Sequence, residues 1–526
     1  MAYDIIYVNG ANRVLVESPT PASVLYSVAG SKIVRYKDRD WVACPHDLDS
    51  VDALRRLGYD VEANVNFGGY KYTGRYTPFA HQAQTVAFMA THRKAFNFSH
   101  PGTGKTSSAL WAADYLIKQG KVKKVLVVAP LTTLRDVWER ECFTTVTHLA
   151  TAVLSGTKAQ RCIALAQDVD IYITNHDGVK TMYHEIQARA DIDLVIVDES
   201  TAYKTPTADR TKAMMRIGLT HNRRFWAMTG TPMANMPTDV WTMARVICPE
   251  LVPKSFNMFR EQTCHKITNF KWAPRADAVQ MVLDRLHPAI CFRKKDCLDL
   301  PAVMTIQRHV EPSPNQMNFI KTIKSEFVAE IGGKEITAAN AAVLIGKVLQ
   351  VLEGVVIHDS STGEGIIIGA QSRIDVLKEL IESSNSKTIV FAPYTKALDY
   401  LQDELKEYGI GRIDGSVSET KRAVILRKFE EDPSMRVLIA HPRTTSHGLT
   451  LTSASTIIFY GPIHSPEVYE QAINRIDRPG QKFSMTVAQI SGHPIESRIY
   501  DTVAKKMRIQ TQLLDMVAQL TTDAAL

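Results

Sequence analysis

Runs of apolar and β-branched residues alternate with helical patterns between residues 77 and 250. The runs fall at residues 125–128, 171–174, 194–197 and 225–228. Buried strands that alternate with helices are typical of a parallel sheet covered on both faces, so an α/β unit is predicted here. Polar or turn-forming residues follow each run. Because ligands bind at the carboxyl ends of the strands in such sheets, we expect the chemistry in these turns.

The same alternation returns after residue 373 and predicts a second α/β unit. Its strands are expected at residues 388–391, 437–440 and 456–459, with helices at residues 396–407 and 419–430. The stretch before it is less regular, with helical patterns at residues 276–286, 314–330 and 338–352 around the basic cluster Arg293-Lys294-Lys295. A last amphipathic helix is predicted over residues 494–520, packing back across the domains. Its apolar positions are Ile495, Ile499, Val503, Met507, Leu513 and Leu514.

The start of the chain has a different pattern. Short strands are predicted at residues 5–8, 14–16, 33–36 and 41–44, and a helix at residues 47–57. Its near-neutral charge favours a packing or capping role. The chain is thus predicted to divide into an α+β accessory domain (1–72), a first α/β lobe (73–250), a connector with a helical protrusion (251–372), a second α/β lobe (373–493) and a C-terminal brace helix with a tail (494–526).

Composition indicates a soluble protein of several domains but does not identify a ligand. The chain has 526 residues, 45% of them hydrophobic, which suffices for several domains with full cores. A formal net charge of +7 is compatible with a nucleic-acid partner but does not require one. Seven scattered cysteines without a Cys-x-x-Cys pair argue against a disulfide framework or a zinc site. Without a signal peptide or a membrane-length apolar run, we expect a soluble cytoplasmic protein with no membrane partner.

A candidate phosphate-binding loop occupies residues 98–107, which read Phe-Ser-His-Pro-Gly-Thr-Gly-Lys-Thr-Ser. Residues 102–106 fit the end of a P-loop, in which a glycine turn directs backbone N–H groups at phosphate oxygens. In that motif the lysine binds the β and γ phosphates, and the threonine hydroxyl is a ligand of Mg²⁺. Ser99 stands where the pattern has its first glycine, and a bare Gly-Lys-Thr match also arises by chance. The motif alone therefore leaves ATP binding open.

An acidic pair follows the apolar run at residues 194–197. Asp198 and Glu199 stand where P-loop ATPases need one carboxylate for Mg²⁺ and another to orient or deprotonate the attacking water. A solvated loop would also carry such a pair, but the P-loop upstream favours ATPase chemistry. The run at residues 225–228 ends in Thr229-Gly230-Thr231-Pro232, whose hydroxyls could sense the nucleotide or simply form a good turn.

Two arginines near the end of the second unit lie on one helix face. Arg475 and Arg478 are three residues apart. Arginines of a second domain can reach the γ-phosphate across a cleft and stabilise the transition state as arginine fingers. A surface face that pairs with Asp477 is the more common arrangement for an isolated Arg-x-x-Arg pair, so the pair alone decides nothing.

The order of these motifs resembles that of superfamily-two helicases, and more narrowly of Swi/Snf-type DNA translocases. The resemblance covers about residues 73–515 and rests, in order, on Gln82, residues 99–106, 130–132, 174–177, 198–201, 229–235, 448–451 and 471–481. Three stretches are close to that family's signatures. They are Met-Thr-Gly-Thr-Pro-Met-Ala-Asn at residues 228–235, the Arg-x-x-Arg-x-Gly-Gln ending at residues 475–481, and Arg293-Lys294 before Leu300-Pro301. In lacking large insertions, the chain resembles the compact members of that family, which include phage-encoded proteins and annealing helicases. A bacterial or phage-infected host cytosol is therefore expected.

The resemblance implies two RecA-like lobes with ATP between them, and a role for each motif. Gln82 would read adenine, and the phosphates would bind Gly102, Thr103, Gly104, Lys105, Thr106 and Ser107. Thr106 and Asp198 would hold Mg²⁺, Glu199 would activate water, and Arg475 and Arg478 would complete the catalytic set with Lys105. Thr229, Thr231 and Gln471 would couple the nucleotide to lobe movement. The nucleic-acid track would be lined by Pro130, Leu131, Thr132, Thr174, Asn175, Ser416, Gly448 and Thr450, which suit phosphate contacts.

The sequence departs from the family pattern after the acidic pair. The family usually has Ala-His there, whereas this chain has Ser200-Thr201, which puts the coupling of hydrolysis to nucleic-acid binding in question. The leading hypothesis is a monomeric, ATP-dependent DNA helicase or translocase that acts on duplex or branched DNA in replication, recombination or repair. The alternatives are an RNA helicase and a nucleic-acid-binding scaffold with a decayed motor. The intact Lys105 and Glu199 argue against decay.

Overall fold

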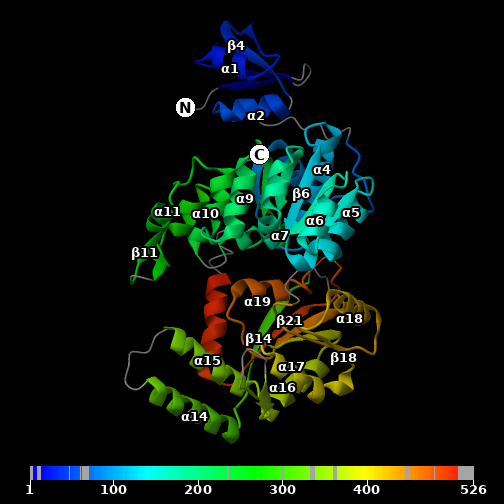
Figure 1. Ribbon diagram of the computed structural model, residues 1–526, viewed down its shortest axis with the longest axis vertical. Coiled ribbons are helices and arrows are strands. Elements are labelled where there is room, and N and C mark those ends of the chain that lie inside the picture. The colour runs from blue at the N-terminus through cyan, green and yellow to red at the C-terminus, as the bar shows by residue number, and fades with distance from the viewer. Residues whose placement is uncertain are drawn as a thin grey trace.

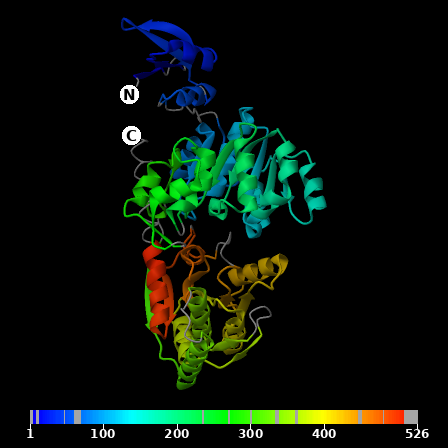
Figure 2. The same cartoon turned by 60° about the vertical axis from the view of Figure 1, so that its left-hand side comes forward.

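Three parts are stacked along the long axis of the molecule: a small N-terminal domain, a first lobe and a second lobe (Figures 1 and 2). The computed structural model describes residues 4–8, 13–46, 48–59, 61, 70–233, 236–268, 271–297, 301–331, 338–358, 364–444, 451–478 and 480–507. Both lobes are parallel sheets covered by helices, so the predicted pair of tandem RecA-like lobes is confirmed.

The first lobe is built on a seven-stranded sheet in the order β13-β5-β10-β9-β6-β8-β7, and its described pairings are parallel. The strands are β5 (Lys94–Asn97), β6 (Lys124–Ala129), β7 (Thr151–Leu154), β8 (Ile171–Asn175), β9 (Ile192–Val197), β10 (Arg224–Met228) and β13 (Ala289–Ile290). Along β6, Leu126 and Val128 enter one hydrophobic core while Val125 and Val127 enter another. The central strands therefore read as unbroken apolar runs because both faces are covered.

Helices cover both faces of this sheet (Figure 1). The helices of this lobe are α3 (Ala80–Thr91), α4 (Lys105–Lys118), α5 (Arg140–Thr145), α6 (Lys158–Leu165), α7 (His176–Thr181), α8 (Tyr183–Ala188), α9 (Asp209–Leu219), α10 (Trp241–Ile247), α11 (Phe256–Thr263), α12 (Ala278–Leu283) and α13 (Lys294–Cys297). Shorter helical turns are η3 (Leu131–Thr133), η4 (Leu134–Glu139), η5 (Ser200–Tyr203) and η6 (Pro237–Val240). A small hairpin of β11 (Cys264–Lys266) and β12 (Trp272–Pro274) projects beyond α11.

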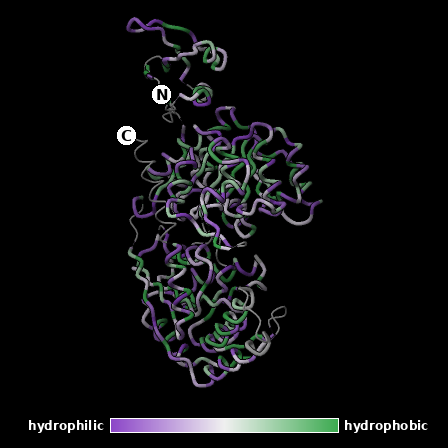
Figure 3. The backbone as a smooth tube through the Cα atoms, turned by 90° about the vertical axis from the view of Figure 1, so that its left-hand side faces the viewer, coloured by the Kyte–Doolittle hydropathy of each residue, from purple (hydrophilic) through white to green (hydrophobic). Residues whose placement is uncertain are grey.

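The second lobe has a six-stranded sheet in the order β14-β21-β20-β17-β19-β18, again with parallel pairings. Its strands are β14 (Val303–His309), β17 (Lys387–Phe391), β18 (Ile410–Ile413), β19 (Val437–Ala440), β20 (Ala454–Phe459) and β21 (Met485–Ser491). Its helices are α16 (Gln371–Glu382), α17 (Thr395–Glu404), α18 (Glu419–Glu431) and α19 (Pro466–Ile473), with a short turn η7 (Lys406–Tyr408). Hydrophobic residues concentrate inside both lobes (Figure 3).

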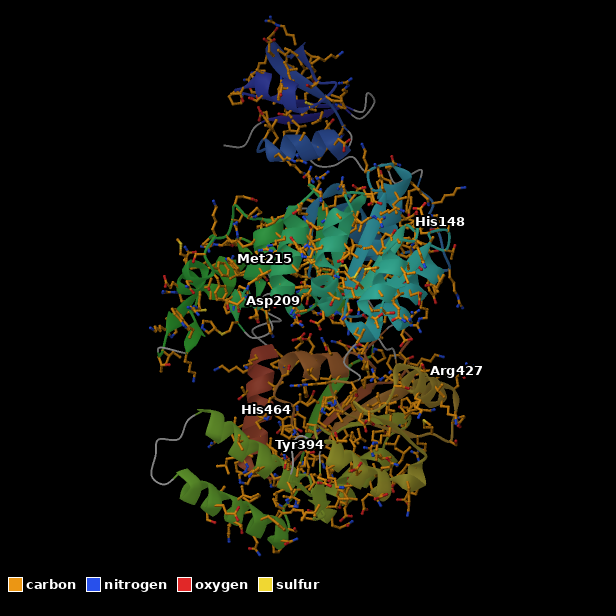
Figure 4. All side chains as sticks on the ribbon, viewed as in Figure 1. His148, Asp209, Met215, Tyr394, Arg427 and His464 are labelled. Carbon is orange, nitrogen blue, oxygen red and sulfur yellow. The ribbon has the colours of Figure 1, made fainter. Side chains whose placement is uncertain are left out.

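A helical protrusion and the C-terminal helix pack on the second lobe. The protrusion consists of α14 (Pro314–Ile331) and α15 (Ala338–Leu352), followed by the hairpin β15 (Val355–Ile357) and β16 (Gly365–Ile367). Tyr394, labelled in Figure 4, donates a hydrogen bond to the Gly346 carbonyl in α15 (3.2 Å). In the helix at residues 494–507, Tyr500 and Val503 join a core of the second lobe, whereas Ile495 packs against the protrusion.

The N-terminal domain is a four-stranded antiparallel sheet in the order β1-β2-β4-β3. Its elements are β1 (Ile5–Val8), β2 (Arg13–Val16), α1 (Pro21–Ser27), β3 (Lys32–Tyr36), β4 (Arg39–Pro45) and α2 (Leu48–Arg56). Arg55 in α2 donates to the Thr91 carbonyl at the end of α3 (3.3 Å), and Asp49 pairs with Lys121. The domain thus rests on the first lobe through α2.

Several boundaries differ from the sequence-based expectation. The expected connector at residues 251–372 supplies β13 to the first sheet and β14 to the second, so each lobe extends into it. Strands β5, β7, β18 and β21 were not predicted. Helix α1 was missed because Pro21 was interpreted as a break, although proline at a first helical position favours a helix start.

The C-terminal helix also differs from expectation in its packing. Its described residues, 494–507, lie on the second lobe and the protrusion rather than across the domains. The predicted apolar positions Leu513 and Leu514 lie outside the described residues. Within the part of the chain that the structure describes, no helix is both long enough and apolar enough to span a membrane.

Candidate nucleotide site between the two lobes

A cavity of about 480 Å³ gathers most of the predicted site residues at the boundary of the lobes. The first lobe lines it with Gln82, Gly102, Thr103, Gly104, Lys105, Thr106, Ser107, Asp198 and Glu199. The second lobe lines it with Gln471, Asn474, Arg475 and Arg478. Figure 4 shows side chains of the two lobes on either side of this boundary. Motifs from distant parts of the chain therefore meet in one site.

The phosphate-binding loop joins β5 to α4 through a tight glycine turn. Gly102 has φ +85° and Gly104 has φ +81°, which only glycine adopts without strain. A Cβ at position 104 would lie 1.9 Å from Gln82 Nε2, so a larger residue there would have to displace the Gln82 side chain. Gly104 is the N-cap of the 14-residue helix α4, and the N-terminal end of this long helix faces the cavity.

Lys105 begins α4, and its ammonium group is turned back onto the loop. Its Nζ donates to the backbone carbonyl of Ser99 at 2.6 Å. Burial lowers the pKa of Lys105, while the nearby Glu199 and Asp198 oppose that shift. An anion in the cavity would compete with the Ser99 carbonyl for this ammonium group.

Gln82 connects α3 to the phosphate-binding loop. Its Oε1 accepts from the backbone N–H of Phe79 (2.9 Å), and its Nε2 donates to the Thr103 carbonyl (3.4 Å). His81 Nε2 lies 2.9 Å from the same carbonyl. The side chain predicted to read adenine is therefore held at the edge of the cavity by the loop itself.

The acidic pair follows β9 and is fixed by its surroundings. Asp198 Oδ2 accepts from Trp138 Nε1, and Oδ1 accepts from the backbone N–H of Glu199, both at 3.0 Å. Glu199 has φ +46°, a left-handed conformation that costs energy in a non-glycine residue. Trp138 was not among the predicted site residues; no motif in the sequence joins it to Asp198.

Burial perturbs both carboxyl groups of the pair. It raises the pKa of Asp198, and the hydrogen bond from Trp138 opposes the shift. Burial, with Asp198 next, raises the pKa of Glu199 to about 8. A carboxylate with a pKa near neutrality is well suited to accept a proton.

The Thr-Gly-Thr-Pro turn lies between the acidic pair and the phosphate-binding loop. Thr229 Oγ1 donates to Glu199 Oε2 at 3.4 Å, and the backbone N–H of Thr231 donates to Thr229 Oγ1 at 3.1 Å. A Cβ on Gly230 would lie 2.7 Å from Pro101 Cδ. The turn therefore touches both groups that would meet a γ-phosphate.

Helix α19 and the turn after it bring the second lobe to the cavity. Gln471 and Arg475 are four residues apart, and Arg475 Nε donates to the Gln471 carbonyl (3.0 Å). Arg478 Nε donates to the Asn474 carbonyl (2.9 Å). Burial lowers the pKa of both guanidinium groups, that of Arg478 to about 10. Both arginines are thus set in the cavity wall rather than on a solvated surface face.

Lys294 is a site residue whose place the sequence did not reveal. Its Nζ forms an ion pair with Asp477 (2.7 Å) in the turn that carries the arginines. The sequence showed only a basic cluster, Arg293-Lys294-Lys295, near a family signature. Asp477, considered above as a surface partner of the arginine pair, thus also pairs with this distant, buried lysine.

The departure at Ser200-Thr201 also lies at the lobe boundary. Thr201 is 6% exposed, and its Oγ1 donates to Glu467 Oε1 in the first turn of α19 (3.4 Å). A hydroxyl therefore makes an inter-lobe contact in the segment where the family usually carries histidine.

The predicted nucleic-acid track is only partly accessible. Leu131 is 57% exposed, Thr132 is half-buried and Ser416 is exposed, with Ser416 Oγ donating to Asp414 (2.6 Å). Pro130 is buried. Gly448 and Thr450 lie outside the described residues.

Two track residues at the end of β8 are enclosed instead. Thr174 is 0% exposed, and its hydroxyl donates to the Leu154 carbonyl (3.4 Å), so a direct contact with a nucleic acid does not fit. Asn175 is 7% exposed and accepts from Arg161 at 3.0 Å. Both predicted track residues are therefore enclosed by their own lobe rather than exposed on its surface.

The cavity has the donors that a nucleoside triphosphate needs. The glycine turn and the N-terminal end of α4 form a cradle for phosphate oxygens. Buried Gln471 Nε2 has no hydrogen-bond partner among the described residues. The hydroxyl of Thr106 and the carboxylate of Asp198 line the same cavity and are oxygen ligands of the kind that Mg²⁺ prefers.

The chain is similar to several known proteins. The ISWI chromatin-remodeling complex ATPase ISW2 of Saccharomyces cerevisiae is 23% identical over 440 residues, 78% of this chain and 38% of that protein. Protein p41 of Acyrthosiphon pisum secondary endosymbiont phage 1 is 24% identical, covering 76% of this chain and 88% of that protein. The solved "Sulfolobus solfataricus SWI2/SNF2 ATPase core in complex with dsDNA" is 19% identical with a TM-score of 0.40, covering 86% of this chain and 96% of that one.

The family follows from the domain matches. This chain spans about two fifths of the length of the yeast relative. The helicase conserved C-terminal domain matches residues 372–480. The SNF2-related domain matches residues 81–356, more than half of the 526 residues. The chain therefore belongs to the SNF2-related family.

Proposed function

We propose that this chain is a nucleic-acid-dependent ATPase that uses ATP hydrolysis to move along DNA. One observation carries the proposal: the phosphate-binding loop and acidic pair of the first lobe share one cavity with Gln471, Arg475 and Arg478 of the second. A site divided in this way works only when the lobes are together. Hydrolysis and lobe movement are then linked, which is what a motor requires.

The first lobe binds the nucleotide. Lys105 exchanges the Ser99 carbonyl for the β and γ phosphates, and backbone N–H groups of residues 102–107 bind the remaining phosphate oxygens. Gln82, which lines the cavity beside the loop, contacts the adenine. Thr106 and Asp198 would hold Mg²⁺, which would supply positive charge against the phosphates.

The chemical step needs residues of both lobes. Glu199 accepts the proton of the attacking water at its carboxylate, which Thr229 orients through a hydrogen bond. Arg475 and Arg478 stabilise the negative charge that develops on the γ-phosphate. Thr231 in the first lobe and Gln471 in the second couple the loss of that phosphate to movement of the lobes.

DNA is the proposed track because the chain belongs to the SNF2-related family and the yeast relative is named a chromatin-remodeling ATPase. We assign phosphate contacts to the accessible residues Leu131, Thr132 and Ser416, and not to the buried Thr174 and Asn175. Such contacts hold a strand without reading its sequence. Forked or branched DNA in replication, recombination or repair is the proposed context, with the chain acting as a monomer.

An ATPase titration tests the proposal. Turnover is measured with single-stranded, duplex, forked and four-way DNA and with RNA of equal length, together with strand displacement and annealing. Duplex or branched DNA should stimulate most, and binding should weaken steeply with salt. Lys105→Ala is the control that should abolish turnover. Equal stimulation by RNA would support an RNA helicase, and turnover unchanged by Lys105→Ala would contradict the site.

A further inference from the structure

The connector between the lobes runs directly beside the phosphate-binding loop. Phe98 N–H donates to the Ile290 carbonyl (2.8 Å), and His100 N–H donates to the Phe292 carbonyl (3.0 Å). In return, Phe292 N–H donates to the side-chain Oγ of Ser99 (3.1 Å). The connector is therefore bonded to the loop by backbone and by one side chain.

Ser99 contacts both the connector and the lysine of the loop. Its Oγ accepts from Phe292, while its backbone carbonyl accepts from Lys105 Nζ (2.6 Å). Ser99 is 2% exposed, so water does not readily replace either partner. The serine that replaces the first P-loop glycine thus has a contact that glycine cannot make.

Two residues further along, Lys294 crosses from the connector to the second lobe. Its Nζ donates to Asn474 Oδ1 (2.6 Å), to Asp477 Oδ2 (2.7 Å) and to the Asp477 carbonyl (2.8 Å). An ammonium group has three donors, so all of them are used. Lys294 is 8% exposed, and its Cε lies 3.5 Å from where a Cβ on Gly102 would be.

These bonds fix the turn that carries the arginines. Asn474, whose side chain accepts from Lys294, also provides the backbone carbonyl that accepts from Arg478 Nε (2.9 Å). Asp477 directly precedes Arg478 in the chain. A buried charge is costly to separate from its partners, so this contact differs from an exposed surface ion pair.

We infer that Lys294 is a positioning residue for Arg478. The connector, through Ser99, Phe292 and Lys294, holds the arginine turn against the phosphate-binding loop. When Lys105 exchanges the Ser99 carbonyl for a phosphate, any shift of the loop is passed through the connector to the arginine turn, because hydrogen bonds join all three. The inference deepens the proposed ATPase function and rests on it for its catalytic consequence, whereas the mechanical link stands on the bonds alone.

The test compares Lys294→Met with Lys295→Met, a matched control at the exposed neighbouring lysine. A misplacement of about 1 Å costs about 100-fold in rate, so Lys294→Met should lower kcat by about 30- to 100-fold. Fluorescent ATP should bind with an affinity within about threefold of wild type, since the arginine acts mostly in the transition state. Lys295→Met should match wild type in both.

Hydrogen exchange supplies a readout that does not need turnover. Backbone amides at residues 471–478 should exchange faster in Lys294→Met than in Lys295→Met. Asp477→Asn, which weakens the same contact from the other lobe, should give the same increase if Lys294→Met folds poorly. Unchanged exchange in both variants would overturn the inference.

A double-mutant cycle with Ser99→Ala tests the link through the connector. If the residues act as one unit, Ser99→Ala should lower kcat about three- to tenfold alone but add little to Lys294→Met. If the two substitutions lowered kcat by independent factors that multiply in the double variant, the link between Ser99 and Lys294 would be overturned. If wild type shows no ATPase activity, the proposed function fails, and faster exchange in Lys294→Met would still establish the contact.

Discussion

The ionisation of Glu199 gives a direct test of the site. Burial, then Asp198, raises its pKa to about 8, and Glu467 of the second lobe adds to the shift. A catalytic base must be ionised, so activity should rise as the pH passes upward through this pKa. At pH 7 about one Glu199 in eleven would be ionised, and at pH 9 about ten in eleven. We therefore expect kcat/KM for ATP to rise about tenfold between these values.

The assay measures kcat/KM, which reports the ionisation of the enzyme before ATP binds. It is run from pH 6 to 9.5 at constant ionic strength, magnesium and duplex DNA, with nucleotide binding followed in parallel. Glu467→Gln should move the rise to lower pH, because it removes a negative charge near Glu199. Glu199→Gln should bind ATP but lose both turnover and the rise. A profile that is flat above pH 6 would refute the assignment of the base.

Three further substitutions have defined outcomes. Arg478→Ala should lower turnover at least about 1,000-fold while ATP affinity is kept, and equal losses in both would contradict a finger. Gly104→Ala should weaken ATP binding at least about tenfold, since its Cβ would meet Gln82; Gly120→Ala, with φ +66° but open space, is the control. Glu353 is fully buried, and neither carboxyl oxygen has a hydrogen-bond partner among the described residues, so Glu353→Met should stabilise the protein by about 1–3 kcal/mol in thermal unfolding.

Most central strands were predictable because their sequences carry strong patterns, although the interior strands β5 and β21 were missed. Strands such as β9 are buried on both faces and read as apolar runs, and the functional turns follow them directly. Edge strands have no such pattern. Strand β14 is largely exposed, and β13 has only two residues, so both resembled connector sequence.

The residues of the candidate site likewise fall into those that the sequence predicted and those that it did not. The glycine turn, the acidic pair and the arginine pair were found because local spacing reflects their chemistry. Lys294 was missed because its burial depends on Asp477, far along the chain, and a run of basic residues usually marks a solvated surface. The burial of Thr174 was not foreseen for the converse reason, since a polar residue near the end of a strand does not reveal that it faces inward.

The short segment between the two sheets limits how far the two halves of the site can separate. Only residues 291–302 separate β13 of the first sheet from β14 of the second. Fully extended, this segment spans about 40 Å, so the start of β14 in the second lobe stays within that reach of the end of β13 in the first. A short tether of this kind gives an effective concentration in the millimolar range. Closure of the site is thus an intramolecular event whose frequency does not depend on the concentration of the protein.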